Sequence, residues 1–231
     1  MADVPKVFKQ SNIYKCLQNI LGLTLIFSFL TFPNPKYVFV SLALWILIST
    51  VLTALSFKAR WNAANIVTFS RALGLVTCSF TLAYHQSIHI LVLFLLGVCL
   101  LADALDGYLA RRFTSSFAGK ILDGETDQQF VFLTATTSYI LTPMPFWILL
   151  FPAIKYIFEI MYILLNLNLS EANAKKRRKT IAAVVMFILL LNLTTLLQKE
   201  LIILVTFIGF LFLLYSFCAD IIQSIKEKRV Y

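Results

Sequence analysis

Residues 101–128 read LADALDGYLARRFTSSFAGKILDGETDQ, and this stretch decides the fold and the chemistry that the chain suggests. It places four aspartates in a strongly apolar chain: Asp103, Asp106, Asp123 and Asp127. Long apolar runs flank both Asp-bearing segments. A charged side chain at membrane depth is costly, and it is usually retained there because it has a function. We therefore look for chemistry at the edge of a membrane.

The composition predicts a membrane protein. Hydrophobic residues make up 60% of the 231 residues and charged residues only 13%, which is outside the range of ordinary soluble domains. A helical span needs roughly 20 apolar residues, and the chain supplies about eight such runs. They lie near 16–32, 37–57, 64–84, 88–108, 122–141, 146–167, 180–198 and 201–222. Since the runs are continuous rather than alternating, they predict an all-α polytopic membrane helix bundle and not a barrel of strands.

The distribution of basic residues predicts the orientation. With a cytoplasmic N-terminus and eight crossings, 16 of the 20 Lys and Arg residues fall on the cytoplasmic side, two fall outside and two lie within spans, as the positive-inside rule predicts. Both termini and the aspartate segment then lie at the cytoplasmic face. The net charge of +9 fits attraction to anionic lipid headgroups. Because the basic residues are dispersed over several loops, no nucleic-acid partner is expected.

Two parts of the chain are distinguished by their chemistry. Residues 1–60 are predicted to form an N-terminal two-span hairpin, and no motif in them suggests catalysis or binding. Residues 61–231 predict a six-span core that contains all four aspartates. Proline-containing turns, FPNPK at 32–36 and TPMP at 142–145, are expected at the outer ends of spans.

The spacing of the aspartates predicts a metal site. On a helix, Asp103 and Asp106 are three residues apart, and Asp123 and Asp127 are four apart, so each pair projects from one helix face. Carboxylates at this density repel one another unless cations neutralise them. Hard oxygen ligands suit Mg²⁺, Mn²⁺ or Ca²⁺ and not zinc, which prefers His or Cys ligands. Two such ions could clamp a phosphoryl group.

Three residues between the aspartate pairs suit a phosphate. Gly107 follows Asp106 and lets a phosphate approach the helix backbone. Arg111 offers a planar fork for a phosphate or a diphosphate. Gly119 opens the next expected helix, whose free amide groups can bind an anion. Together with the carboxylates, these residues indicate a nucleoside-diphosphate pocket.

The order of these residues resembles the signature of the CDP-alcohol phosphotransferases, which are six-helix membrane enzymes of phospholipid synthesis. The matching run is Asp103-x2-Asp106-Gly107-x2-Ala110-Arg111-x7-Gly119-x3-Asp123-x3-Asp127. The connection between Arg111 and Gly119 is one residue shorter than is usual in that family. The expected six-span core around the signature fits the core of the family.

The resemblance implies a role for each matching residue. Asp103, Asp106 and Asp123 are metal ligands, and Asp127 is both associated with the metal and the general base that takes the proton of an alcohol. Gly107, Arg111 and Gly119 contact the CDP moiety. The implied reaction is attack of an alcohol on the β-phosphorus of a CDP-linked lipid, CDP-diacylglycerol being expected, with release of CMP. Two Mg²⁺ or Mn²⁺ ions are the implied cofactors, and the polar acceptor alcohol is left open.

Two further segments resemble parts of the same family. Asn65 and Arg71, in NIVTFSR, are similar to its Asn-x2-Thr-x2-Arg stretch, which implies contacts to the nucleotide. Alternatively, Asn65 caps a helix and Arg71 is an ion-pair partner of an aspartate. The basic run AKKRRKT, residues 174–180, is either a subsite for a phosphate of the acceptor or only a signal of membrane topology.

Other readings of the aspartates belong to different classes of membrane protein. Membrane prenyltransferases also bind Mg²⁺ and a diphosphate with two Asp-rich segments, and transporters use intramembrane carboxylates as relays. The Asp-Gly-x2-Ala-Arg run argues against both, and no inverted repeat typical of transporters is found. The partners expected are a CDP-linked lipid, an alcohol, membrane lipids and a second copy of the chain in a homodimer.

Overall fold

The structure is a computed structural model of the chain. It describes residues 4–56, 63–112, 117–164, 172–194 and 196–230, without the side chains of 4–13, 63–64, 104–112, 117–118, 172–176 and 226–230. These residues are almost wholly helical and contain no strand. The predicted all-α bundle is therefore confirmed.

The described residues form eight α-helices, and these correspond in order to the predicted apolar runs. Their bounds are α1 Val4–Thr31, α2 Pro35–Ser56, α3 Ala63–His85, α4 Ile90–Arg112, α5 Phe117–Leu141, α6 Leu150–Leu164, α7 Ala172–Leu191 and α8 Lys199–Val230. A short 3-10 turn, η1 Phe146–Leu149, leads into α6. Several helices continue beyond the apolar run that predicted them, because polar residues at a membrane surface can prolong a helix.

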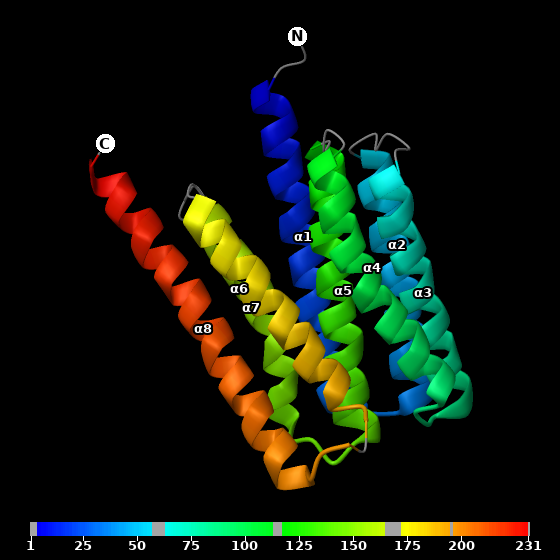
Figure 1. Ribbon diagram of the computed structural model, residues 1–231. Helices are drawn as coiled ribbons and strands as arrows, with labels where there is room; N and C mark the ends of the chain where they lie inside the picture. Colours follow the sequence, from blue (N-terminus) through cyan, green and yellow to red (C-terminus); the bar gives the residue numbers. More distant parts are fainter. Residues whose placement is uncertain (1–3, 57–62, 113–116, 165–171, 195, 231) are drawn as a thin grey trace.

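The helices run up and down through one bundle. One end of the bundle holds the start of α1 and the last residues of α8 (Figure 1). The end of α4 and the start of α5, which follows it in the chain, lie at the same end. Helix α3 packs against α2, α4 and α5, while α7 and α8 pack against each other at the other side. An even number of crossings requires the first and last helices to end on the same side of the bundle, as they do here.

The proline-containing turn before α2 shows how the sequence starts a helix. Pro35 is the first residue of α2, where its missing N–H is not needed and its fixed φ suits the helix. The side-chain Oδ1 of Asn34 accepts a hydrogen bond from the Lys36 backbone N–H at 3.2 Å. Asn34 thus caps one of the amide groups that the first turn leaves unpaired.

Four described helical segments are long and apolar enough to cross a membrane. They are Pro35–Ser56, Asn65–His85, Phe146–Leu164 and Lys199–Ile225. Helix α4 is apolar over the shorter stretch Ile90–Asp103, which ends at the first residue of the signature. The chain is therefore a multi-pass membrane protein, while the number of eight crossings stays a prediction.

Helix α5 lies in the middle of the bundle and contacts α2, α3, α6 and α7. Its Phe132 packs edge-on against the rings of Trp45 in α2 and Tyr156 in α6, with centroids 5.3 Å and 6.3 Å away. Phe29 of α1 adjoins the same ring at 5.8 Å. These aromatic contacts hold three helices, α1, α2 and α6, around the middle of α5.

The two N-terminal helices do not pair mainly with each other. Helix α1 packs against α6, and α2 packs against α3 and α5. Asn19 of α1 donates a hydrogen bond from Nδ2 to Oε2 of Glu159 in α6 at 3.1 Å. The division into a hairpin and a catalytic core stays a prediction, but both N-terminal helices are packed directly on core helices.

Gly22 allows α1 to approach α6 closely, and this contact generates a prediction. A Cβ at Gly22 would lie 2.5 Å from Cε2 of Tyr156, whose buried ring cannot move aside. Gly22→Ala should therefore destabilise the protein by about 1–3 kcal/mol, as overpacking usually does. Thermal unfolding in detergent measures the effect. Gly97→Ala is the matched control, because nothing lies within 4 Å of the added Cβ; equal melting temperatures for the two variants would contradict the prediction.

Candidate metal centre

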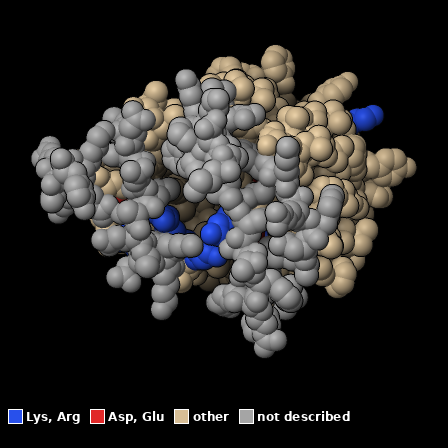
Figure 2. Space-filling view, turned by 90° about the horizontal axis from the view of Figure 1, so that it is seen from above, with Lys and Arg blue, Asp and Glu red and all other residues tan. Residues whose placement is uncertain are grey.

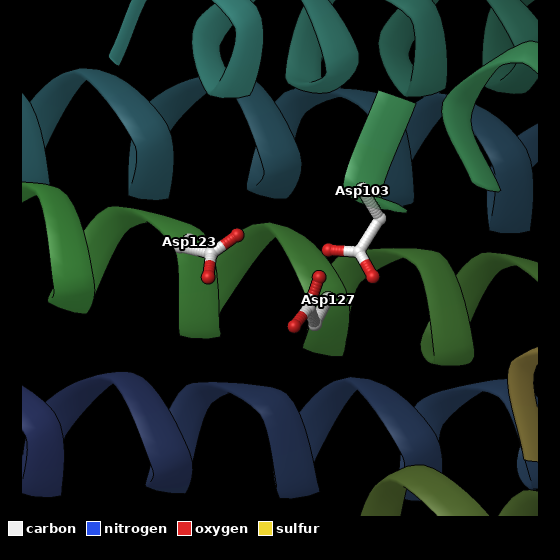
Figure 3. A group of neighbouring side chains, drawn as sticks. All are labelled: Asp103, Asp123 and Asp127. Atoms are coloured by element: carbon white, nitrogen blue, oxygen red, sulfur yellow. The ribbon is translucent and has the colours of Figure 1, made fainter. Parts of the chain in front are cut away.

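Three of the four signature aspartates converge between two neighbouring helices. Asp103 comes from α4, and Asp123 and Asp127 come from successive turns of α5. Their carboxylates point toward one another (Figure 3), and one oxygen of each lies within 4.8 Å of the others. The four-residue spacing on α5 brings its two side chains onto one face, as the sequence predicted.

Arg71 of α3 reaches into the middle of these carboxylates. Its Nη1 lies 3.1 Å from Oδ1 of Asp103 and 3.1 Å from Oδ1 of Asp123. Its Nη2 donates to Oδ1 of Asp127 at 2.7 Å. The Arg71 side chain is only 2% exposed, whereas the three carboxylates are 25–32% exposed. One guanidinium therefore joins three helices from the inside and leaves the carboxylates open on their other side.

The charges at this site favour a further cation. Three carboxylates and one guanidinium carry a formal net charge of about −2 when all are ionised. Partial burial strengthens the repulsion between the carboxylates. The donor set consists of hard carboxylate oxygens, and it fits Mg²⁺ or Mn²⁺, which are bound by carboxylates and often keep water or phosphate ligands. We name Asp103, Asp123, Asp127 and Arg71 the acidic cluster.

Helix α3 is fixed to α4 directly beside the acidic cluster. The Cys99 Sγ of α4 approaches the Arg71 backbone carbonyl at 3.7 Å, and a Cβ at Gly74 would lie 3.0 Å from the same sulfur. This close packing fixes the position of Arg71 along the length of α4, and so the level in the bundle from which its side chain extends. The small residues thus allow the two helices to approach, as is common between membrane helices.

Other residues of the signature lie around the connection between α4 and α5. Asp106, Gly107 and Arg111 belong to the last turns of α4, and their surroundings lie outside the described residues. Gly119 is the third residue of α5, so it stands in the first turn of a helix as predicted. Asp103 of α4 lies close to Asp123 and Asp127 of α5. The short connection between Arg111 and Gly119 therefore does not prevent α4 and α5 from bringing their aspartates together.

Asn65 lies in the first turn of α3, which begins at Ala63. It is the third residue of this helix, and the choice between a capping role and a nucleotide contact stays a prediction. Its side chain is buried, with the residue 5% exposed. Buried amides are retained where they find hydrogen-bond partners, which is compatible with a role near a polar site.

The basic run of residues 174–180 forms part of α7 and pairs with a carboxylate that we did not predict. Arg177 and Arg178 both contact Asp220 of α8, and Arg178 Nη1 lies 3.0 Å from its Oδ2. The Asp220 side chain is only 2% exposed. A view onto this end of the bundle shows basic atoms of described residues near its middle (Figure 2). The two arginines of the run thus tie α7 to α8.

The reasoning that identified the signature aspartates, a charged residue within an apolar run, also applies to Asp220. It is the only charged residue in the apolar run 201–225, and such a residue is expected to have a partner. The sequence pattern does not reveal which partner, because that depends on how α7 and α8 pack.

Comparison with protein families connects this geometry to a known group of enzymes. A family model described as CDP-alcohol phosphatidyltransferase matches residues 61–215, which is well over half of the 231 residues. Comparisons with curated proteins and with solved structures found no match. The matched range contains every residue of the acidic cluster and the complete signature. The chain therefore belongs to the CDP-alcohol phosphatidyltransferase family, whose members are transferases of phospholipid biosynthesis.

Proposed function

We propose that this protein transfers a phosphatidyl group from CDP-diacylglycerol to a polar alcohol and releases CMP. The observation that carries the proposal is the convergence of Asp103, Asp123 and Asp127 from two helices inside a region that matches the family. The match favours this reaction over prenyl transfer and over transport, both of which intramembrane carboxylates alone would allow.

In the proposed reaction, the alcohol oxygen forms a bond to the β-phosphorus. The bond between that phosphorus and the oxygen bridging to the α-phosphorus breaks, and CMP leaves with the bonding electrons. Asp127 takes the proton of the alcohol as general base. A base must come within hydrogen-bonding reach of the hydroxyl, and the Asp127 side chain is 30% exposed on the open side of the acidic cluster.

Asp103, Asp106, Asp123 and Asp127 would hold two Mg²⁺ or Mn²⁺ ions. Such ions, when bound, neutralise phosphate charge and stabilise the charge that develops during phosphoryl transfer. The three described carboxylates support this assignment by their spacing. The oxygen-only donor set supports Mg²⁺ or Mn²⁺ over zinc.

The nucleotide would bind beside the carboxylates, contacted by Gly107, Arg111, Gly119 and Asn65. Gly119 stands in the first turn of α5, where free backbone amides favour an anion. For Arg71, the ion pairs with three aspartates favour a role as counter-charge within the acidic cluster over direct contact with the nucleotide. A homodimer stays a prediction.

Release of CMP tests the reaction. Purified protein in lipid vesicles should release CMP from CDP-diacylglycerol when it receives Mg²⁺ or Mn²⁺ and one member of a panel of alcohols, because the acidic cluster requires a divalent cation. The panel should include glycerol phosphate, inositol, inositol phosphate and serine, and chromatography of CMP and lipid products identifies the acceptor. Absence of CMP with every alcohol tested would rule out the proposed reaction.

Removal of the proposed base separates catalysis from binding. Asp127→Asn keeps the size of the side chain but cannot accept the proton, so kcat should fall by about 10²–10⁴ while CDP still binds. Turnover and calorimetric CDP binding measure the two properties. Glu200→Gln is the control, because Glu200 is an exposed acid in the first turn of α8. Unchanged turnover in Asp127→Asn would remove the base assignment.

Loss of Arg71 should make the stability of the protein depend on metal. Removing one partner of a buried ionic network costs about 3–5 kcal/mol, and less here because the carboxylates are partly exposed. Arg71→Leu should therefore melt well below wild type in EDTA and recover most of the difference in Mn²⁺. Lys120→Met, which removes an exposed cation of α5, is the control. An equal loss with and without Mn²⁺ would contradict the proposed counter-charge.

The orientation can be tested independently of activity. We propose that the acidic cluster opens to the cytoplasm. The positive-inside rule places both termini in the cytoplasm, and the start of α1 and the end of α8 lie at the same end of the bundle as the acidic cluster. Epitope tags at either terminus should resist external protease in intact cells and be digested after permeabilisation. Digestion of either tag in intact cells would reverse the proposed orientation.

A further inference from the structure

The face of α5 that points away from the acidic cluster is also polar. Gln129 follows Asp127 by two residues, so the two side chains leave the helix about 200° apart. Gln129 is completely buried, and its side-chain amide is hydrogen-bonded to residues of α2. A rotation of α5 about its axis would therefore move Gln129 and Asp127 together.

Gln129 is hydrogen-bonded to two hydroxyl groups of α2. Its Nε2 donates to Ser49 Oγ at 2.7 Å and to Thr50 Oγ1 at 3.1 Å. Thr50 Oγ1 lies 3.4 Å from Gln129 Oε1 and donates to it in return. Ser49 and Thr50 are both buried. Both ends of the amide are thus engaged, and this fixes its orientation relative to α2.

The same hydroxyl-rich turn of α2 is bound to α1. Tyr14 donates from its hydroxyl to the Ser49 backbone carbonyl at 3.0 Å, and the same hydroxyl lies 2.6 Å from Thr53 Oγ1. Thr53 Oγ1 also donates to the Ser49 carbonyl at 2.7 Å. A continuous polar connection therefore runs from α1 through α2 to the central helix α5.

Small rotations of α5 matter for the acidic cluster. With side chains, a helix has a radius of about 5–6 Å, so a rotation of about 20° would shift the Asp123 and Asp127 side chains by about 2 Å. The ligand oxygens of the three aspartates span only 4.8 Å. Lipid provides little hydrophobic force to orient one helix against another, so interhelical hydrogen bonds contribute to the choice of rotation.

We propose that Gln129 is a positioning residue, which with Ser49 and Thr50 sets the rotation of α5 and so brings Asp123 and Asp127 into register with Asp103. The inference rests on the proposed metal-binding function of the acidic cluster. Since α2 lies before the region of residues 61–215 that matches the family, the N-terminal helices of this chain act on the metal site from outside that region.

The affinity for Mn²⁺ tests this inference without requiring turnover. Gln129→Leu has a similar volume and removes the bonds to α2, while Ser49 Oγ keeps its hydrogen bond to the Ile46 carbonyl at 3.1 Å. We expect the Mn²⁺ Kd of the folded, full-length protein, measured by electron paramagnetic resonance without nucleotide, to rise about tenfold. The Ser49→Ala/Thr50→Val variant removes the same bonds from α2, and it decides the question if Gln129→Leu does not fold.

The combined variant and a matched control distinguish positioning from stability. Adding Ser49→Ala/Thr50→Val to Gln129→Leu should raise the Kd no further, because the bonds are already lost. Thr137→Val is the control, because buried Thr137 donates to the Leu133 carbonyl of its own helix and to no other group among the described residues; its Kd should match wild type even if its melting temperature falls. If wild type binds Mn²⁺ and both bond-removing variants bind it equally well, the inference fails alone. If wild type binds no Mn²⁺, the inference fails together with the proposed metal site.

Discussion

The salt bridges of Arg71 to three aspartates are the interaction on which the arrangement of the site depends. The guanidinium comes from α3, and its partners come from α4 and α5, so these three helices must pack at one depth and rotation for the contacts to form. A buried arginine without these partners would be strongly unfavourable, as would three neighbouring carboxylates without a cation. The charges therefore specify how the helices meet, whereas apolar packing alone leaves several arrangements close in energy.

Helix α5 connects the chemistry to the rest of the bundle. One face carries Asp123 and Asp127, and other faces carry buried polar groups that bond to neighbouring helices. In addition to the bonds of Gln129, Gln128 donates from Nε2 to the Pro152 carbonyl at 2.9 Å, and Lys155 donates from Nζ to the Gly124 carbonyl at 2.7 Å. A membrane helix that is polar on several faces must find a partner for each, since lipid offers none. Those partners come from α2 and α6, so the N-terminal helix α2 also supports the site.

The chain combines a family region with additional helices that are not merely appended to it. The family match covers residues 61–215, yet α2 packs against α3 and α5, and α1 packs against α6. The close approach of Gly22 to Tyr156 and the hydrogen bond from Asn19 to Glu159 show that α1 lies directly on the bundle. Because polar bonds and small residues hold membrane helices together, these contacts can transmit the position of the N-terminal helices to the central helix.

The sequence by itself determined the class of protein and the order of the helices, and it predicted the chemistry of the site. Those features follow from local patterns: the length of apolar runs, the Asn-Pro start of α2, and spacings of three and four residues that place carboxylates on one helix face. Only the tertiary structure decided which helices are neighbours. It assigned Arg71 to the aspartates rather than leaving it equally a nucleotide contact, paired Asp220 with Arg177 and Arg178, and turned Gln129 toward α2. An apolar helix is compatible with many neighbours in a bilayer, and the choice among them depends on polar partners that lie far apart in the chain.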